Sequence, residues 1–113
     1  MAEYHEKWDA LSPEVRDLHR AIKSLQEELE AVDWYHQRVA LTDDDGLRRI
    51  LEHNRNEEIE HAAMIMEWLR RHMDGWDDEL STYLFTDAPI VEVEEDGPSG
   101  GTSLGIGKPE GGE

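Results

Sequence analysis

The residues best suited to chemistry are a glutamate and a histidine three positions apart, Glu58 and His61, in the segment NEEIEHAAM. Residues at this spacing share one face of a helix, one turn apart. Apolar residues continue that face on both sides, so we expect the pair to be buried. A buried carboxylate and imidazole are costly without compensation. A bound metal ion would supply it; the competing interpretation is a hydrogen-bonded Glu–His pair in an interface.

A further carboxylate, Glu28, is predicted at the matching depth of the preceding helix. It borders a stripe of apolar residues that recur every three or four positions, namely Val15, Leu18, Ile22, Leu25, Leu29 and Val32. In ferritin-like four-helix bundles, a di-iron centre takes one Glu from each of two helices and a Glu-x-x-His pair from each of the other two. This chain supplies half of that set, and two copies on a two-fold axis would complete it.

The charges of such a paired site balance. Two Fe²⁺ ions carry four positive charges, and two copies each of Glu28 and Glu58 carry four negative charges, which removes most of the burial penalty. Oxygen ligands with one imidazole per metal suit iron or manganese, and anionic ligands favour the ferric state. Two adjacent irons can then pass two electrons to dioxygen. Zinc would also bind here and would be inert.

The elements that position these residues are predicted to be three helices, over residues 13–40, 43–72 and 76–85. Ser12 and Thr42 are N-cap candidates for the two long helices, and Gly75 allows a turn after the second. The short break between the long helices predicts an antiparallel hairpin. The fold class is therefore all-α: a two-helix hairpin plus a short third helix, dimerising into a ferritin-like four-helix bundle.

Composition divides the 113 residues into three parts. We expect an N-terminal arm over residues 1–11, a helical domain over 12–93 and a disordered tail over 94–113. Residues 86–113 hold seven of the nine glycines and three of the four prolines. Ile90, Val91 and Val93 alternate with acids, which favours a short extended contact after Pro89. The remaining ~85 residues give a marginal core, so oligomerisation is expected.

Charge and residue types exclude several classes of function. The net charge of −17 argues against nucleic acid and anionic membranes as partners. The chain has no cysteine, which excludes disulfides, thiolate zinc sites and iron–sulfur clusters. No apolar run approaches the ~18 residues of a spanning helix, and the N-terminus lacks a signal-like region. A cytoplasmic location follows by default.

Several other residues leave alternatives open. Glu27 and Glu30 flank Glu28, and a solvated face with salt bridges is as good a reading as metal binding. Asp33 and His36 repeat the carboxylate–imidazole spacing but point away from Glu28, and we interpret them as surface residues. The Tyr35 hydroxyl is placed to hydrogen-bond a ligand carboxylate. In the tail, Leu104 and Ile106 have the spacing of a short peptide that docks two side chains into a groove; the bland alternative is an unrelated apolar pair.

The chain resembles a known family, the encapsulated ferritins, which are cargo proteins of encapsulin nanocompartments. The resemblance covers roughly residues 14–93 and the tail tip. It rests on these segments: HRAI (19–22), EELEAVDWY (27–35), QRV (37–39), HNRNEE (53–58), EHAAM (60–64), EWLRR (67–71), TYLFTDAPI (82–90) and SLGIG (103–107).

The resemblance implies a ring-shaped homodecamer of dimers with ferroxidase activity at a di-iron site between subunits, ligated by Glu28, Glu58 and His61. It implies a secondary site on the path of incoming iron at Glu27, Glu30 and Trp34, where calcium is a further candidate, and a supporting role for Tyr35. It also implies that Leu104 and Ile106 belong to a peptide that targets the chain into an encapsulin shell. Tails of this family usually continue with a second Ser-Leu, where this chain has Lys108-Pro109; the missing leucine would weaken that docking.

Three functions therefore compete. The first is a ferroxidase that delivers ferric iron inside an encapsulin compartment. The second is a non-enzymatic helical assembly protein whose subunits are joined by metal. The third is a plain acidic dimerisation module, which would assemble in the presence of a chelator. Iron oxidation separates the first from the others, and metal-dependent mass separates the second from the third.

Overall fold

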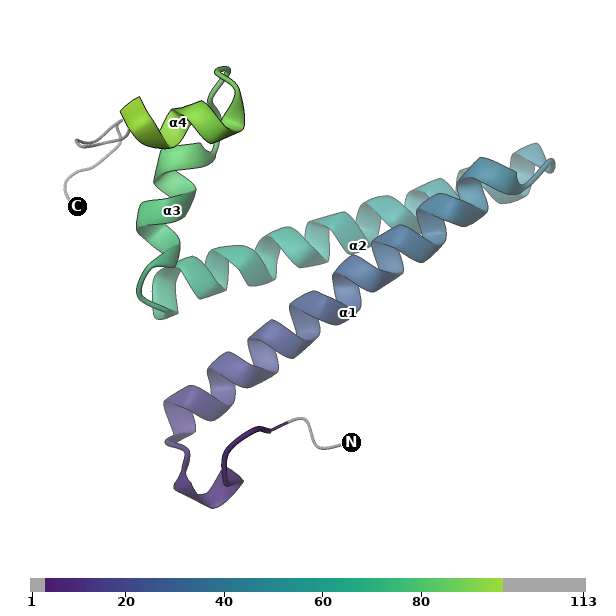
Figure 1. Ribbon diagram of the computed structural model, residues 1–113. Helices are drawn as coiled ribbons and strands as arrows, with labels where there is room; N and C mark the ends of the chain where they lie inside the picture. Colours follow the sequence, from purple (N-terminus) through teal and green to yellow (C-terminus); the bar gives the residue numbers. More distant parts are fainter. Residues whose placement is uncertain (1–3, 97–113) are drawn as a thin grey trace. The chain divides into compact units, whose positions relative to one another are not determined.

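The computed structural model describes residues 4–96. Two long helices, α1 (Pro13–Leu41) and α2 (Asp45–His72), run antiparallel and side by side (Figure 1). Over the described residues the secondary structure is helical and contains no strand. The prediction of an all-α fold built on a two-helix hairpin is therefore confirmed.

The chain divides after His72 into two compact units. The first unit holds the hairpin and a short 3-10 helix, η1 (Trp8–Ala10). The second holds two short helices, α3 (Trp76–Tyr83) and α4 (Ile90–Asp96). No helix among residues 4–96 is both long enough and apolar enough to cross a membrane.

The start of α1 follows the prediction. The Ser12 hydroxyl accepts the Val15 N–H at 3.2 Å, and Pro13 occupies the first turn, where its missing N–H costs nothing. Arg16 then ties the preceding segment to the helix. Its guanidinium lies 3.5 Å from the centroid of the Trp8 ring, and its Nη2 donates to the Trp8 carbonyl at 2.8 Å.

The start of α2 differs from the prediction, because the capping side chain is Asp44 and not Thr42. Asp44 Oδ2 accepts the Leu47 N–H at 2.7 Å, whereas Thr42 Oγ1 accepts the Asp44 N–H at 3.3 Å. Arg48 closes the turn by binding Asp45 at 3.0 Å. A carboxylate is the stronger cap here because it also interacts with the positive end of the helix dipole.

The second unit corrects one expectation. Residues 90–93 are helical, not extended, as the start of α4. The Glu92 N–H donates to the Pro89 carbonyl at 2.9 Å, so Pro89 precedes a helix whose first turn its fixed φ suits. Val93 is buried, whereas Ile90 and Val91 are exposed. The alternation of apolar and acidic residues was therefore a misleading signal over so short a segment.

The ends of α3 reflect two unusual backbone positions. Gly75, with a φ of 102°, makes the turn before α3, as predicted. The helix ends at Tyr83, two residues before the predicted end at Phe85, which itself has a φ of 62°. A positive φ cannot continue a right-handed helix, so the chain turns there.

Candidate metal centre

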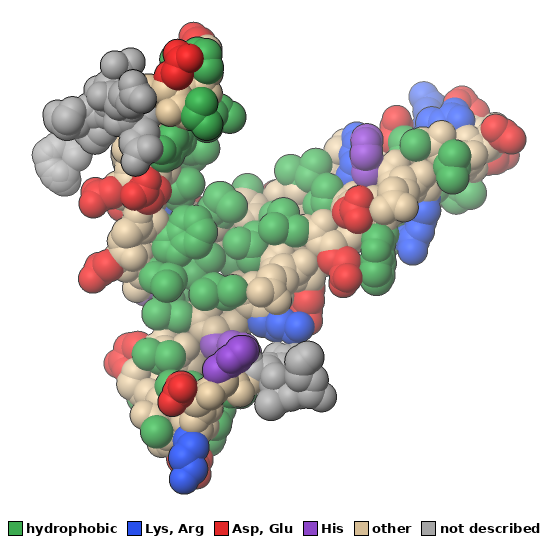
Figure 2. Space-filling view, viewed as in Figure 1, with side chains coloured by type: hydrophobic (Ala, Val, Ile, Leu, Met, Phe, Trp, Pro, Cys, Tyr) green, Lys and Arg blue, Asp and Glu red, His purple; other side chains and the backbone are tan. Residues whose placement is uncertain are grey.

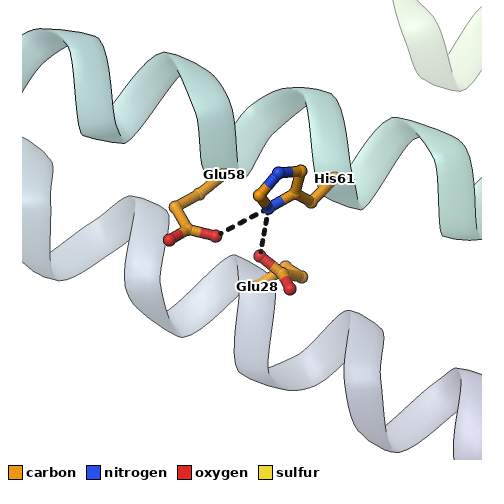
Figure 3. Close-up of side chains that lie close together, drawn as sticks. All are labelled: Glu28, Glu58 and His61. Atoms are coloured by element: carbon orange, nitrogen blue, oxygen red, sulfur yellow. Dashed lines mark hydrogen bonds and ion pairs between the residues drawn. The ribbon is translucent and has the colours of Figure 1, made fainter.

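The hairpin brings together the three predicted metal ligands. Glu28 projects from the middle of α1, and Glu58 and His61 project from facing positions on α2 (Figure 3). One candidate ligand atom from each lies within 4.8 Å of the others. Within residues 4–96, this is the group of His, Asp and Glu side chains with the geometry to hold a metal ion.

One ring nitrogen of His61 faces both carboxylates. His61 Nδ1 lies 3.2 Å from Glu58 Oε1 and 3.4 Å from Glu28 Oε1 (Figure 3). Its hydrogen bond is with Glu58. The other contact is an ion pair that leaves the buried Glu28 Oε1 without a hydrogen bond. A buried carboxylate oxygen with no donor is the arrangement that a cation would satisfy, so these residues fit a metal ion.

The three side chains are partly exposed, whereas the apolar face predicted that Glu58 and His61 would be buried. Glu28 and Glu58 are 25% and 24% exposed, and His61 is 42% exposed. Three protein ligands on one side of an open position cannot enclose an ion by themselves, because iron and similar cations take more donors than this. The chain by itself therefore presents an incomplete site with its open side toward solvent.

The proximity of the three groups shifts their pKa values. Close contact with the Glu58 carboxylate, together with partial desolvation, raises the pKa of Glu28. The same contact lowers the pKa of Glu58, because protonation of one carboxylate of the pair favours charge on the other. The hydrogen bond with Glu58 and the charge of Glu28 raise the pKa of His61. The cluster thus attracts protons, and a cation would compete with them.

The residues predicted for the secondary iron site, and the other polar candidates on α1, lie outside the cluster of Glu28, Glu58 and His61. Glu27, Glu30 and Trp34 are exposed on α1 and stay predictions as metal ligands. Tyr35 is half-buried, with the Arg38 guanidinium 5.2 Å from its ring centroid. His36 is exposed, and its Nδ1 lies 3.1 Å from Arg55 Nη1 on the facing helix. Leu104 and Ile106 lie outside the described residues.

The sequence analysis assigned no role to one residue on the face of α2 that carries His61. Asn54 is a half-buried amide in the apolar stripe of α2, seven residues before His61. The spacing alone could have indicated a link, because seven residues are close to two helical turns and place Asn54 and His61 on one stripe.

Comparison with known proteins places this fold in a class. The chain is 58% identical over 110 residues to the "Ferritin-like protein" of Thermotoga maritima, covering 94% of this chain and 96% of the relative. It is 56% identical over 90 residues to the "Encapsulated ferritin-like protein" of Rhodospirillum rubrum, covering 80% of this chain and 64% of that longer protein. A crystal structure of a Nitrosomonas europaea protein superimposes with a TM-score of 0.74 at 59% identity, over 77% of this chain and 96% of that one.

These likenesses define a class of ferritin-like helical-hairpin proteins. The EncFtn-like family model matches residues 3–87, which is most of the chain. The protein belongs to the EncFtn-like family of encapsulated ferritins.

Proposed function

We propose that the protein is a ferroxidase that oxidises Fe²⁺ to Fe³⁺ with dioxygen, at a site completed by a second copy of the chain. The observation that carries the proposal is the half-site of Glu28, Glu58 and His61. Their candidate ligand atoms lie within 4.8 Å of one another, and the side chains are partly exposed. Two such half-sites facing each other supply four carboxylates and two imidazoles, which is the ligand set of a ferritin-like di-iron centre.

The surface around His61 supports pairing with a second copy. Ile50 lies 11 residues before His61, about 20° away around the helix, and Met64 lies one turn after it. Their side chains are 59% and 58% exposed. Hydrophobic side chains gather along the hairpin, and charged ones are frequent around the turn between α1 and α2 (Figure 2). An apolar face of this kind next to an incomplete site favours burial against a like surface.

The small core of the chain supports the same conclusion. Within the described residues, the buried apolar side chains are Leu25, Ala62, Leu69 and Val93. Such a core is too small to stabilise a domain of this length alone. Association of two hairpins into a four-helix bundle would bury the remaining stripe residues.

The chemistry follows from the side chains. Iron is the substrate, and each pair of Fe²⁺ ions gives up two electrons, which dioxygen accepts. Glu28 and Glu58 supply negative charge that stabilises the higher oxidation state, and His61 Nδ1 supplies one nitrogen donor per copy. The net charge of −17 draws cations toward the protein.

We further propose that the protein works as cargo inside an encapsulin shell, as part of an iron-storage compartment. The membership of an encapsulated ferritin family supports this role. The SLGIG segment over residues 103–107 is the proposed attachment to the shell. A ring of five dimers remains the expected assembly, with metal helping it to form.

Oxygen uptake after aerobic addition of Fe²⁺ tests the activity. Wild type is expected to consume oxygen and to develop ferric absorbance, whereas Glu58→Ala and His61→Ala are expected to fall to the rate in buffer alone. Glu57→Ala, an exposed neighbour of Glu58, is the matched control and is expected to retain activity. Metal-dependent association without oxygen uptake by wild type would instead favour the non-enzymatic assembly protein.

A further inference from the structure

Asn54 and His61 are polar residues on an edge of α2 that also carries the apolar residues Ile50 and Trp68. Ile50, Asn54, His61 and Trp68 lie within about 20–40° of one another around the helix, because 7, 11 and 14 residues are close to whole numbers of turns. In the described part of the chain, the Asn54 amide has no hydrogen-bond partner. Pairing of two hairpins through this edge would bury that amide, and a buried amide without a partner is costly.

Among the described residues, His61 also has a polar group without a hydrogen-bond partner, the N–H at Nε2. Its Nδ1 faces the two carboxylates, so Nδ1 is the nitrogen placed to bind a metal (Figure 3). Its Nε2 then carries the proton, and this group has no acceptor among residues 4–96. A metal-bound histidine almost always donates its second N–H to a fixed acceptor, which sets the tautomer and the ring orientation.

Asn54 of the same chain cannot be that acceptor. The two residues are seven apart, which is roughly 10 Å along the helix axis, beyond the reach of the two side chains. A two-fold axis between two copies can instead bring Asn54 of one copy close to His61 of the other. Asn54 lies about 6 Å from Glu58 along α2 in one direction, and His61 lies about 4.5 Å away in the other. If the axis passes at the level of Glu58, the reversed second copy places its His61 within about 1.5 Å of the level of Asn54.

We propose that Asn54 Oδ1 of one copy accepts the Nε2–H of His61 of the second copy in the metal-loaded assembly. This inference rests on the proposed two-copy site. Asn54 is a positioning residue: it orients the imidazole and raises its basicity toward metal without touching the metal. The contact also satisfies the amide, which explains why an amide stands among Ile50, Trp68 and other apolar residues.

Zinc-dependent association tests the proposal without relying on turnover. The protein is titrated with Zn²⁺ and its association is followed by analytical ultracentrifugation. Asn54→Leu keeps the side-chain volume and removes the acceptor, and we expect it to need about 10–100-fold more zinc. Asn54→Asp keeps an acceptor and should restore much of the affinity. Asn56→Leu is the matched control: Asn56 is exposed and its Oδ1 accepts from Arg55, so wild-type affinity is expected.

Failure of the Asn54 contact and failure of the two-copy site give different results. If Asn54→Leu associates at the wild-type zinc concentration or below it, Asn54 serves only packing and the inference is overturned, while the two-copy site stands. If wild type does not associate with zinc, or if His61→Ala associates equally well, the two-copy site fails and the inference fails with it.

A mixed assembly tests whether the contact crosses between chains. Asn54→Leu chains labelled with ¹⁵N are paired with unlabelled His61→Ala chains through two affinity tags, with zinc in excess. The labelled chain then has an intact His61 facing the intact Asn54 of the other chain. We expect its Nε2–H to exchange slowly by NMR, as in wild type, and to exchange rapidly in the Asn54→Leu homodimer. Rapid exchange in both assemblies would overturn the cross-chain contact.

Discussion

At the scale of single residues, protons would compete with metal ions for the atoms of the proposed metal site. The hydrogen bond to Glu58 raises the pKa of His61, so Nδ1 keeps its proton to a higher pH than an ordinary histidine would. A metal needs that nitrogen unprotonated. Metal-dependent association should therefore weaken as the pH falls through the raised pKa of His61, and should be complete only above it.

Glu58→Gln tests the cause of this shift in the metal-free protein. Replacing the carboxylate by an amide removes a negatively charged acceptor, so the pKa of His61 should fall toward its ordinary value of about 6.5. The measurement is an NMR titration of the His61 ring. Glu57→Gln, which changes an exposed neighbour, should leave the pKa of His61 at its wild-type value. An equal change in both variants would show that general charge, not contact, causes the shift.

At the scale of elements, each long helix carries its own local stabilisation. Ser12 caps α1 and Asp44 caps α2. Near the end of α2, Glu67 accepts from Arg70 Nε at 2.7 Å and from Arg71 Nε at 2.7 Å. These two guanidinium groups lower the pKa of Glu67 to about 2. The cluster holds the last turns of α2, a short distance beyond His61.

This cluster predicts a pH-dependent effect of Glu67→Gln. A carboxylate whose pKa is about 2 when folded and ~4.3 when unfolded stabilises the fold fully above ~4.3, and this stabilisation is lost as the pH falls toward 2. The gap in thermal midpoint between wild type and Glu67→Gln should therefore be larger at pH 7 than at pH 3. Glu60→Gln, an exposed change on the same helix, is the control. A gap that does not change with pH would contradict the ion-pair explanation.

At the scale of the whole molecule, the net charge opposes the proposed assembly of two copies. Two copies with a net charge of −17 each repel one another. In the proposed two-copy site, bound cations would offset that repulsion locally, and salt would screen the rest. Assembly should therefore depend on metal most strongly at low ionic strength. In that proposed assembly, the apolar stripes would supply the attraction, and the two half-sites would fix the register between the copies.

The tail predicts a separation of loading from chemistry. Deleting residues 103–113 removes Leu104 and Ile106 and leaves the hairpin intact. Loading into a co-expressed encapsulin shell should be abolished, while the rate of Fe²⁺ oxidation by the purified chain should not change. Co-purification with the shell gives the first quantity, and oxygen uptake gives the second. Equal loading of the shortened chain would show that another surface binds the shell.

The sequence by itself determined the features that depend on neighbours along the chain. The spacing of Glu58 and His61, the cap at Ser12 and the turn at Gly75 are local, because the period of a helix and the conformational limits of the backbone act over a few residues. They sufficed to predict the hairpin and the three candidate ligands. The same local signals misplaced the cap at Thr42 and the strand-like pattern of residues 90–93, where short stretches fit two conformations.

The tertiary structure decided what depends on distance in space. Glu28 and Glu58 are 30 residues apart, and only the register between α1 and α2 brings both to one imidazole nitrogen. The same packing leaves Glu28 Oε1 without a donor and leaves the other side of the site open. Sequence pattern assigns a residue to a face of its own helix. The level at which two faces meet follows from how side chains of both helices pack together, and that is a property of the folded chain.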